Sequence, residues 1–147
     1  GVTAVCKAGR HAHYNVFISM KKMSEGDAGR AAAAALTIDH TKNVFVFDED
    51  IDVFNPTDIL WAIATRVQPH RQISILQPLF RGNFLDPSLV DEIKTSGMIV
   101  DATKPLDRPF SPVSKCPDEA MERIKLEEFV PGEVLQHIPM DRTTYWA

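Results

Sequence analysis

The sequence predicts an α/β fold with a mixed, centrally parallel sheet and helices on its faces. Three observations predict it. Short runs of β-branched and aromatic residues alternate with helical segments along the chain. The runs at residues 2–8 and 14–20 are separated by a short polar turn, which predicts an antiparallel hairpin. Residues 44–47 then lead through an acidic turn into a helix, as in half of a βαβ unit.

The composition is that of one globular domain. The chain has 147 residues, of which 44% are hydrophobic and 24% charged, and this length suffices for a core. A net charge of −4 without a basic block weighs against a nucleic-acid binder. No apolar run approaches the ~20 residues that span a membrane, and no signal peptide precedes the first strand, so we expect a cytoplasmic protein. The sequence begins without Met and enters a strand-like run almost at once, from which we expect a piece of a longer protein.

An alanine-rich helix is predicted between the second and third strands. Ser24 and Asp27 are spaced like a capping box, although Gly26 and Gly29 weaken the helix start. Five consecutive alanines follow at residues 31–35, and alanine favours a helix while adding almost no bulk. We therefore expect this helix to pack closely against the sheet.

A second helix follows the acidic turn with its start signals in order. Asn55 is a plausible N-cap, Pro56 fits the first helical position, and Asp58 places negative charge at the positive end of the helix dipole. Residues 59–67 are apolar on most sides. This pattern predicts a buried helix.

The rest of the chain is less regular. Further strands are predicted at residues 72–76 and 97–102, with an irregular segment at 78–87 and a helical turn at 88–94 between them. Recurring prolines beyond residue 104 predict a proline-rich arm, and a C-terminal helix is predicted at residues 117–126. Residues 127–147 contain aromatic residues with little periodicity, so we expect this tail to dock on a partner or on a domain outside the chain.

The acidic turn is the first candidate for chemistry. Clustered carboxylates at the end of a strand can hold Mg²⁺ or Ca²⁺, although the spacing is not that of an EF-hand. They can equally accept hydrogen bonds from turn amides and form salt bridges to Arg66 or other basic side chains, and we favour that structural role. A role at a domain interface is the third interpretation of this turn. A free-standing domain that binds a small ligand or a divalent metal stays as the alternative function. The four carboxylates are Asp48, Glu49, Asp50 and Asp52.

No other motif specifies chemistry. His11 and His13 could share one strand face as zinc ligands do, but exposed histidines are the favoured interpretation. Cys6 and Cys116 match no metal spacing, and there is no nucleophile elbow and no glycine-rich phosphate loop. Lys104, after the last strand, could face a phosphate, but a surface lysine is the favoured interpretation. The residues by themselves predict an α/β domain without visible catalytic machinery.

The stretch VFVFDEDIDVFNPTDILWAIATRVQP nevertheless resembles the C-terminal domain of the UbiD-like family of decarboxylases. That family combines a strand, an acidic DID turn, a capped helix with a W-A-I-x-T-R pattern and a proline. The later MIVDATKPLDRPF resembles the family's closing strand. The resemblance extends to residue 126, which predicts a UbiD-like C-terminal domain at residues 1–126 and a tail at 127–147. The matching residues are Asp50, Ile51, Asp52, Trp61, Ala62, Ile63, Thr65, Arg66, Pro69, Asp101, Ala102, Thr103 and Lys104.

The resemblance implies a non-oxidative, reversible decarboxylase of aromatic, heteroaromatic or α,β-unsaturated carboxylic acids. Its members use prenylated FMN, held with a divalent metal (Mn²⁺ or Mg²⁺) and K⁺ in a preceding catalytic domain. The family's catalytic residues and metal ligands lie in that domain, so we expect no catalytic residue, metal ligand or cofactor in this chain. In some members a lysine after the first helix reaches the cofactor phosphate, which makes Lys42 the candidate cofactor-binding residue here.

The resemblance also implies partners. In the family this domain packs beside the catalytic domain of the same protein, and hinge motion between the two opens the active site. It also helps to form dimers and larger homo-oligomers. We therefore expect an oligomerisation and lid-side domain that does not decarboxylate alone, and neither nucleic acid nor a membrane as partner.

Overall fold

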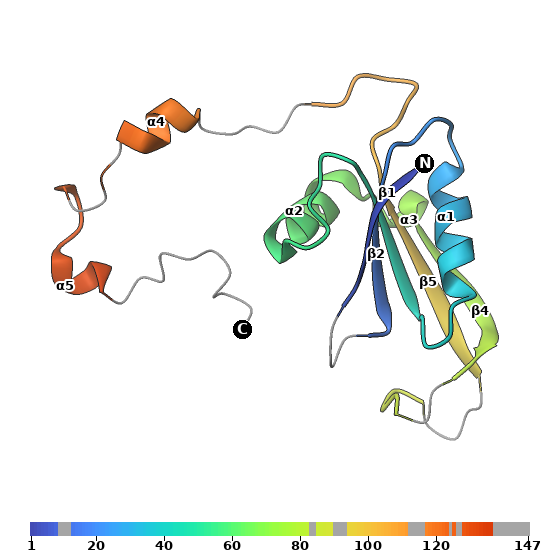
Figure 1. The fold of residues 1–147 in the computed structure, drawn as a ribbon. Helices are drawn as coiled ribbons and strands as arrows, with labels where there is room; N and C mark the ends of the chain where they lie inside the picture. The colour runs from blue at the N-terminus through green and yellow to red at the C-terminus, as the bar shows by residue number, and fades with distance from the viewer. Residues whose placement is uncertain are drawn as a thin grey trace. The chain divides into compact units, whose positions relative to one another are not determined.

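The structure, a computed structural model, describes residues 1–8, 13–82, 85–89, 94–111, 117–123, 125 and 128–136. The chain divides into two units, Gly1–Pro109 and Phe110–Ala147. The first unit holds the sheet and three helices (Figure 1).

The sheet of the first unit has five strands in the order β1-β2-β3-β5-β4. The central strands β2, β3 and β5 are parallel, whereas β1 and β4 pair antiparallel at the two edges. The predicted mixed, centrally parallel sheet and its opening hairpin are therefore confirmed. The strands are β1 (Val2–Lys7), β2 (Asn15–Met20), β3 (Asn43–Asp48), β4 (Ile73–Arg81) and β5 (Lys94–Ala102).

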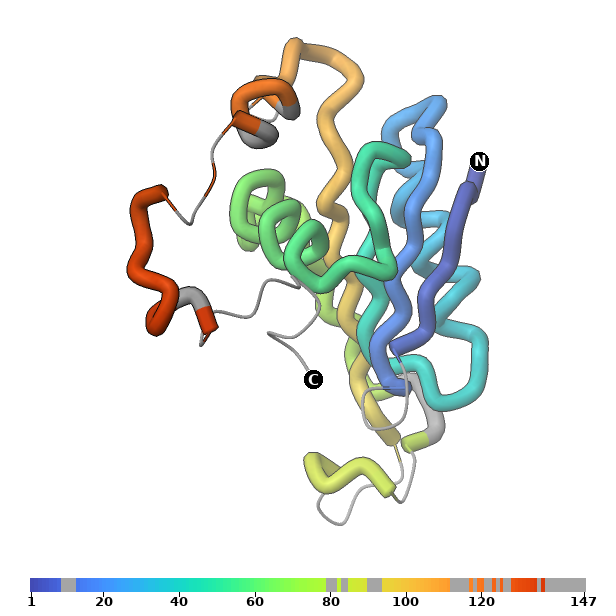
Figure 2. The backbone as a smooth tube through the Cα atoms, turned by 60° about the vertical axis from the view of Figure 1, so that its left-hand side comes forward, coloured from blue at the N-terminus to red at the C-terminus, as the bar shows by residue number. Residues whose placement is uncertain are grey.

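Helix α1 (Asp27–Leu36) covers one face of the sheet, and α2 (Pro56–Arg66) lies on the opposite face (Figures 1 and 2). Ala28 and Ala32 of α1 have no exposed surface and pack against the β2 and β3 side chains of that face. The predicted close packing of an alanine face is confirmed, because side chains without bulk let the helix backbone approach the sheet.

The other face carries larger side chains. Phe47 at the end of β3 is fully buried and packs with Ile59 and Ala62 of α2. The prediction that α2 is buried on most sides is wrong, because Leu60 is 46% exposed. Helix α2 lies on the outside of the sheet, so only one of its faces meets the core, and the buried face includes the charged residue Arg66.

Strand β4 corrects the irregular segment predicted around Pro78. The strand runs through this proline to Arg81, with a register shift between Leu76 and Phe80. Because β4 is an edge strand, a proline there removes no hydrogen bond that a further strand needs. The helical turn predicted at residues 88–94 lies partly outside the described residues, and Lys94 begins β5 instead.

A short helix, α3 (Pro69–Gln72), connects α2 to β4. The second unit contains α4 (Asp118–Arg123), which falls within the predicted C-terminal helix, and α5 (Gly132–Leu135). Residues 137–147 and Cys116 lie outside the described residues. Every helix that the structure describes is too short or too polar to pass through a lipid bilayer.

The N-cap of α2 gives a testable prediction. The Asn55 side chain accepts a hydrogen bond from the Thr57 amide at 3.0 Å, as the sequence predicts. Asn55→Ala should lower the free energy of unfolding by about 1 kcal/mol, because an amide of the first turn loses its acceptor. Urea unfolding of the chain measures this loss. Asn55→Asp keeps an acceptor oxygen and should stay close to the wild type; an equal loss in both variants would contradict the capping role.

Candidate functional site

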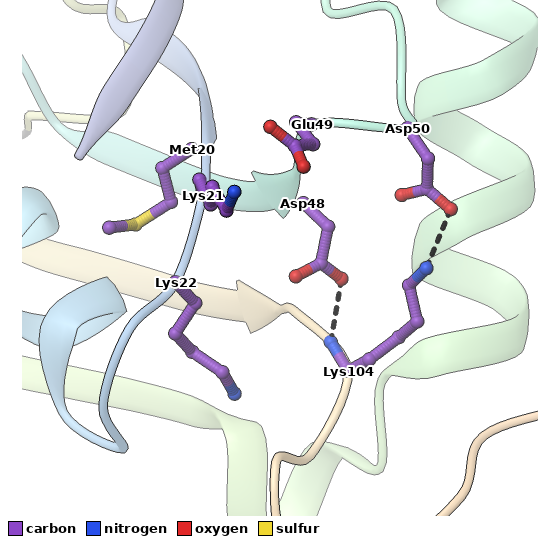
Figure 3. A pocket seen from close by; sticks show the side chains of 7 residues that line it. All are labelled: Met20, Lys21, Lys22, Asp48, Glu49, Asp50 and Lys104. Atoms are coloured by element: carbon purple, nitrogen blue, oxygen red, sulfur yellow. Dashed lines mark hydrogen bonds and ion pairs between the residues drawn. The ribbon is translucent and has the colours of Figure 1, made fainter.

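A pocket of about 280 Å³ lies at the carboxyl ends of the parallel strands (Figure 3). The chain leaves β2 toward α1 on one face and leaves β3 toward α2 on the other, so the pocket occupies the point where the connections diverge. Open α/β sheets bind their ligands at such switch points. We call it the carboxyl-edge pocket; its lining residues are Met20, Lys21, Lys22, Asp48, Glu49, Asp50 and Lys104.

One wall of the pocket rests on a buried arginine. The guanidinium of Arg66 is 1% exposed and donates to Asp50 through two nitrogens, at 3.1 and 2.9 Å. It also donates to Asp48 at 3.1 Å, and it lies 5.3 Å from the ring centre of Trp61. The salt bridges predicted between the acidic turn and Arg66 are therefore present.

Lys104 joins the same cluster from the end of β5. Its backbone amide donates to Asp48 at 2.7 Å, and its ammonium group donates to Asp50 at 2.8 Å (Figure 3). The second oxygen of Asp48 faces the pocket (Figure 3). The sequence left two alternatives for Lys104, a phosphate contact and a surface position. In the structure its ammonium group contacts a carboxylate at the pocket rim.

The environment shifts the pKa values of the two aspartates in opposite directions. Burial raises the pKa of Asp48 above its ordinary value, and the Lys104 amide and the Arg66 guanidinium do not fully offset this effect. Burial also acts upward on Asp50, but the hydrogen bonds from Arg66 and Lys104 outweigh it and hold the pKa of Asp50 at about 2. The pocket therefore keeps a charged Asp50 fixed in ion pairs beside an Asp48 that is more easily protonated.

The lysines after β2 differ in their surroundings. The Lys22 side chain is 3% exposed, and its ammonium group donates to Glu25 at 3.0 Å. Lys21 is exposed and lines the pocket. Sequence reasoning missed both lysines and Glu25; the signal that points to the two lysines is their position directly after a central parallel strand.

Lys42, the candidate cofactor-binding residue, lies at the other end of β3. Its ammonium group donates to Asp86 at 2.8 Å and to the Ser88 hydroxyl at 2.6 Å. Six residues of strand at about 3.3 Å each separate it from Asp48 by roughly 20 Å. The structure thus places Lys42 against the β4–β5 connection and away from the carboxyl-edge pocket. We call the hydrogen-bonded group of Lys42, Asp86 and Ser88 the Lys42 clasp. Its proposed cofactor role stays a prediction.

The Lys42 clasp predicts a change in acid stability. Its hydrogen bonds, first of all that of Lys42, hold the pKa of Asp86 at about 2, below the ordinary 3.8. The clasp therefore stabilises the fold above pH ~4 and loses this contribution as the pH falls toward 2. Urea unfolding at neutral pH and near pH 2.5 measures how far the free energy of unfolding falls on acidification. This decrease should be about 1 kcal/mol smaller in Asp86→Asn than in the wild type. Asp107→Asn, at an exposed carboxyl, is the matched control and should leave the wild-type loss unchanged.

The histidines and cysteines form no site within the described ranges. The rings of His13 and His40 lie 6.3 Å apart, whereas His11, His137 and Cys116 fall outside those ranges. Cys6 is a free thiol on β1. Over the described residues, no group of three or more His, Cys, Asp or Glu side chains could hold a metal ion.

The pocket does not fit a whole flavin. Its wall contains one apolar side chain, Met20, and the other six lining residues are charged. An isoalloxazine ring needs apolar surface on its faces, whereas a phosphate group suits ammonium groups such as that of Lys21. The wall of this pocket thus offers contacts for the charged end of such a cofactor, and its one apolar side chain is Met20.

Comparison with known proteins gives one family. The model described as the 3-octaprenyl-4-hydroxybenzoate carboxy-lyase C-terminal domain matches residues 2–102. An anhydromevalonate phosphate decarboxylase from Aeropyrum pernix is 45% identical over 91 residues, 61% of this chain and 20% of that protein. A phenolic acid decarboxylase from Sedimentibacter hydroxybenzoicus is 38% identical over 95 residues, 62% of this chain and 20% of that protein.

The same family appears among solved structures. The UbiD-class enzyme HmfF from Pelotomaculum thermopropionicum, in complex with FMN, has a TM-score of 0.70 at 34% identity, covering 88% of this chain and 29% of that one. Its evolved dimeric form, in complex with prFMN, has a TM-score of 0.62 at 30% identity, covering 88% and 26%. This chain spans about a fifth of the length of the relatives it matches. The match over residues 2–102, together with the shared fold, shows that the chain belongs to the UbiD family, as its C-terminal domain.

Proposed function

We propose that this chain is the oligomerisation and lid-side domain of a non-oxidative, reversible decarboxylase. Its substrates in this proposal are aromatic, heteroaromatic or α,β-unsaturated carboxylic acids. Prenylated FMN, a divalent metal (Mn²⁺ or Mg²⁺) and K⁺ would be held by a preceding catalytic domain of the same protein, which is the first partner. Family membership and the decarboxylase names of the relatives support this proposal.

The proposal rests on the pairing of charged side chains in the wall of the carboxyl-edge pocket. Its position at the switch point is that of a ligand site, yet Asp50, Lys104 and Lys22 are already paired with other side chains of the domain. A wall whose charged side chains are already paired with one another suits a surface that meets a second domain, because few of its charges are left without a partner when the surface is covered. The pocket would therefore face the catalytic domain.

Lys21 is the residue through which this face would meet the cofactor. It lines the pocket and is exposed, and an ammonium group there favours a phosphate. Lys42 is the competing candidate, with its ammonium group bound to Asp86 and Ser88. When bound, prenylated FMN supplies the electron sink for decarboxylation; this domain would contribute binding and the exclusion of water.

Two measurements test the proposal. The isolated chain with reconstituted prenylated FMN should show no decarboxylation, and turnover would refute the lid-side role. In the full-length enzyme, Lys21→Ala should weaken FMN binding about tenfold, as measured by flavin fluorescence, because one charge-assisted contact is lost. Lys42→Ala should bind FMN like the wild type. Weaker binding in Lys42→Ala alone would move the phosphate contact to the other end of β3.

The alternative function is a free-standing domain that binds a small ligand or a divalent metal through the acidic turn. Against it, Asp48 and Asp50 already contact Arg66 and Lys104, and a cation would have to displace these groups. Ligand binding to the folded state raises its melting temperature. A thermal shift with Mg²⁺, Ca²⁺ or a nucleotide would favour the alternative, and its absence would remove it.

The proposed domain also self-associates. Dimers or larger homo-oligomers are expected, and the tail at residues 127–147 is proposed to dock on a partner or on the catalytic domain. Within the part of the tail that is described, Phe129 is 74% and Val134 49% exposed, which leaves apolar surface for docking. Light scattering that shows a monomeric full-length enzyme would contradict the oligomerisation role. A cytoplasmic location stays a prediction from the sequence.

A further inference from the structure

The segment that leaves β5, residues 103–106, lies outside every strand and helix. Pairing of β5 with β3 ends at Ala102. Among the described residues, no backbone–backbone hydrogen bond reaches this segment. It then continues along the chain toward the second unit, which begins at Phe110.

Carboxylates take the place of backbone partners along this segment. The amide and hydroxyl of Thr103 donate to Asp101, at 3.0 and 2.6 Å. The Lys104 amide donates to Asp48 at 2.7 Å, and the Leu106 amide donates to Glu25 at 2.7 Å. Three carboxylates from three different parts of the fold therefore hold three successive backbone donors, since Pro105 between them has no N–H.

The anchors differ in their exposure. The Asp48 side chain is 16% exposed and part of the Arg66 cluster, whereas that of Glu25 is 60% exposed. Glu25 is also a bridge, because its other oxygen accepts from Lys22, which lines the pocket on the side of β2. Glu25, the outer anchor, thus connects the segment to the opposite wall of the carboxyl-edge pocket. Because Glu25 is the more exposed of the two carboxylates, water competes most easily for its hydrogen bond to Leu106.

We propose that residues 103–106 form a detachable strap that makes one wall of the carboxyl-edge pocket. The strap is released from its outer end, where Glu25 holds Leu106, while the strands of the sheet stay paired. Because Lys104 belongs to both the strap and the pocket wall, displacement of the chain beyond Pro109 moves a charged group of the pocket. The fold thereby contains a route by which the position of the following segment changes the shape of the pocket. This inference does not depend on the proposed decarboxylase activity.

Amide hydrogen exchange at single-residue resolution, on the full chain at neutral pH, tests the strap. In Glu25→Ala the Leu106 amide should exchange about tenfold faster, because it loses its charged acceptor. The Lys104 amide should also accelerate, by about threefold, since the strap detaches as a unit. The amides of Val100 and of helix α1 should exchange as in the wild type.

Two further variants separate the strap from a general loosening of the pocket. Glu49→Gln changes a carboxylate that lines the same pocket and has no hydrogen bond to the strap in the structure, and it should leave both amides unchanged. Glu25→Gln keeps an acceptor oxygen and should restore part of the Leu106 protection. An unchanged Lys104 amide in Glu25→Ala would overturn release as a unit. Faster exchange at Val100 would also overturn it, because the sheet itself would then be opening.

Discussion

Replacing Arg66 with methionine is expected to lower the free energy of unfolding by about 3 to 5 kcal/mol at neutral pH. The guanidinium group is 1% exposed and holds both Asp48 and Asp50. Methionine fills a similar volume, so the loss reports the two carboxylates left without their partner rather than a cavity. Urea unfolding of the chain, followed by circular dichroism, gives the value.

Two further variants make the Arg66 result specific. Arg30→Met alters an exposed arginine on α1 and should change stability by less than about 0.5 kcal/mol. Adding Asp48→Asn to Arg66→Met should recover part of the loss, because it removes the more buried of the two carboxylates. A strictly additive double variant would contradict the idea that the carboxylate left behind causes the instability.

Replacing Phe47 with alanine is expected to lower the free energy of unfolding by about 3 to 5 kcal/mol, through the loss of packing alone. Phe47 is fully buried between the sheet and α2, and its ring centre lies 6.5 Å from that of Phe17. The truncation removes the ring and leaves a cavity that the surrounding strands cannot close, since their backbones are fixed by pairing on both sides. The midpoint of urea unfolding should fall while the slope stays that of the wild type.

Phe54 provides the matched control for Phe47. It lies seven positions later in the chain and is 65% exposed. Phe54→Ala should therefore stay within about 0.5 kcal/mol of the wild type. Equal losses in the two variants would mean that burial in this structure does not determine the cost.

Local patterns in the sequence predict the elements well where one physical signal dominates. Alternation in residues 16–20 places Val16, Ile18 and Met20 on one face, and the structure buries all three. Asn55 and Pro56 identify the start of α2 because capping depends only on neighbours in the chain. The path of β4 through Pro78 is not predictable in this way, since whether a proline is tolerated depends on the strand being at the edge of the sheet.

The candidate site divides similarly. The acidic turn and its pairing with Arg66 follow from charge and proximity in the sequence, and the family resemblance follows from the same motif. Lys22 carries only a weaker signal, its position after a central strand, and it reaches the pocket because β2 and β3 run parallel and side by side. Glu25, which accepts a hydrogen bond from Lys22, carries no such signal. Lys42 shows the same limit, since its contacts with Asp86 and Ser88 depend on the path of the connection between β4 and β5.

By itself, the sequence determined the α/β class, the capped helix after the acidic turn and membership of the UbiD family, because each depends on local pattern or on a continuous motif. Only the tertiary structure decided that segments after β2, β3 and β5 meet in one pocket, and that residues 103–106 cross its rim on carboxylate anchors. The physical reason is that strand order and direction are set by packing across the whole sheet, and these bring together groups that lie 54 to 81 positions apart in the chain.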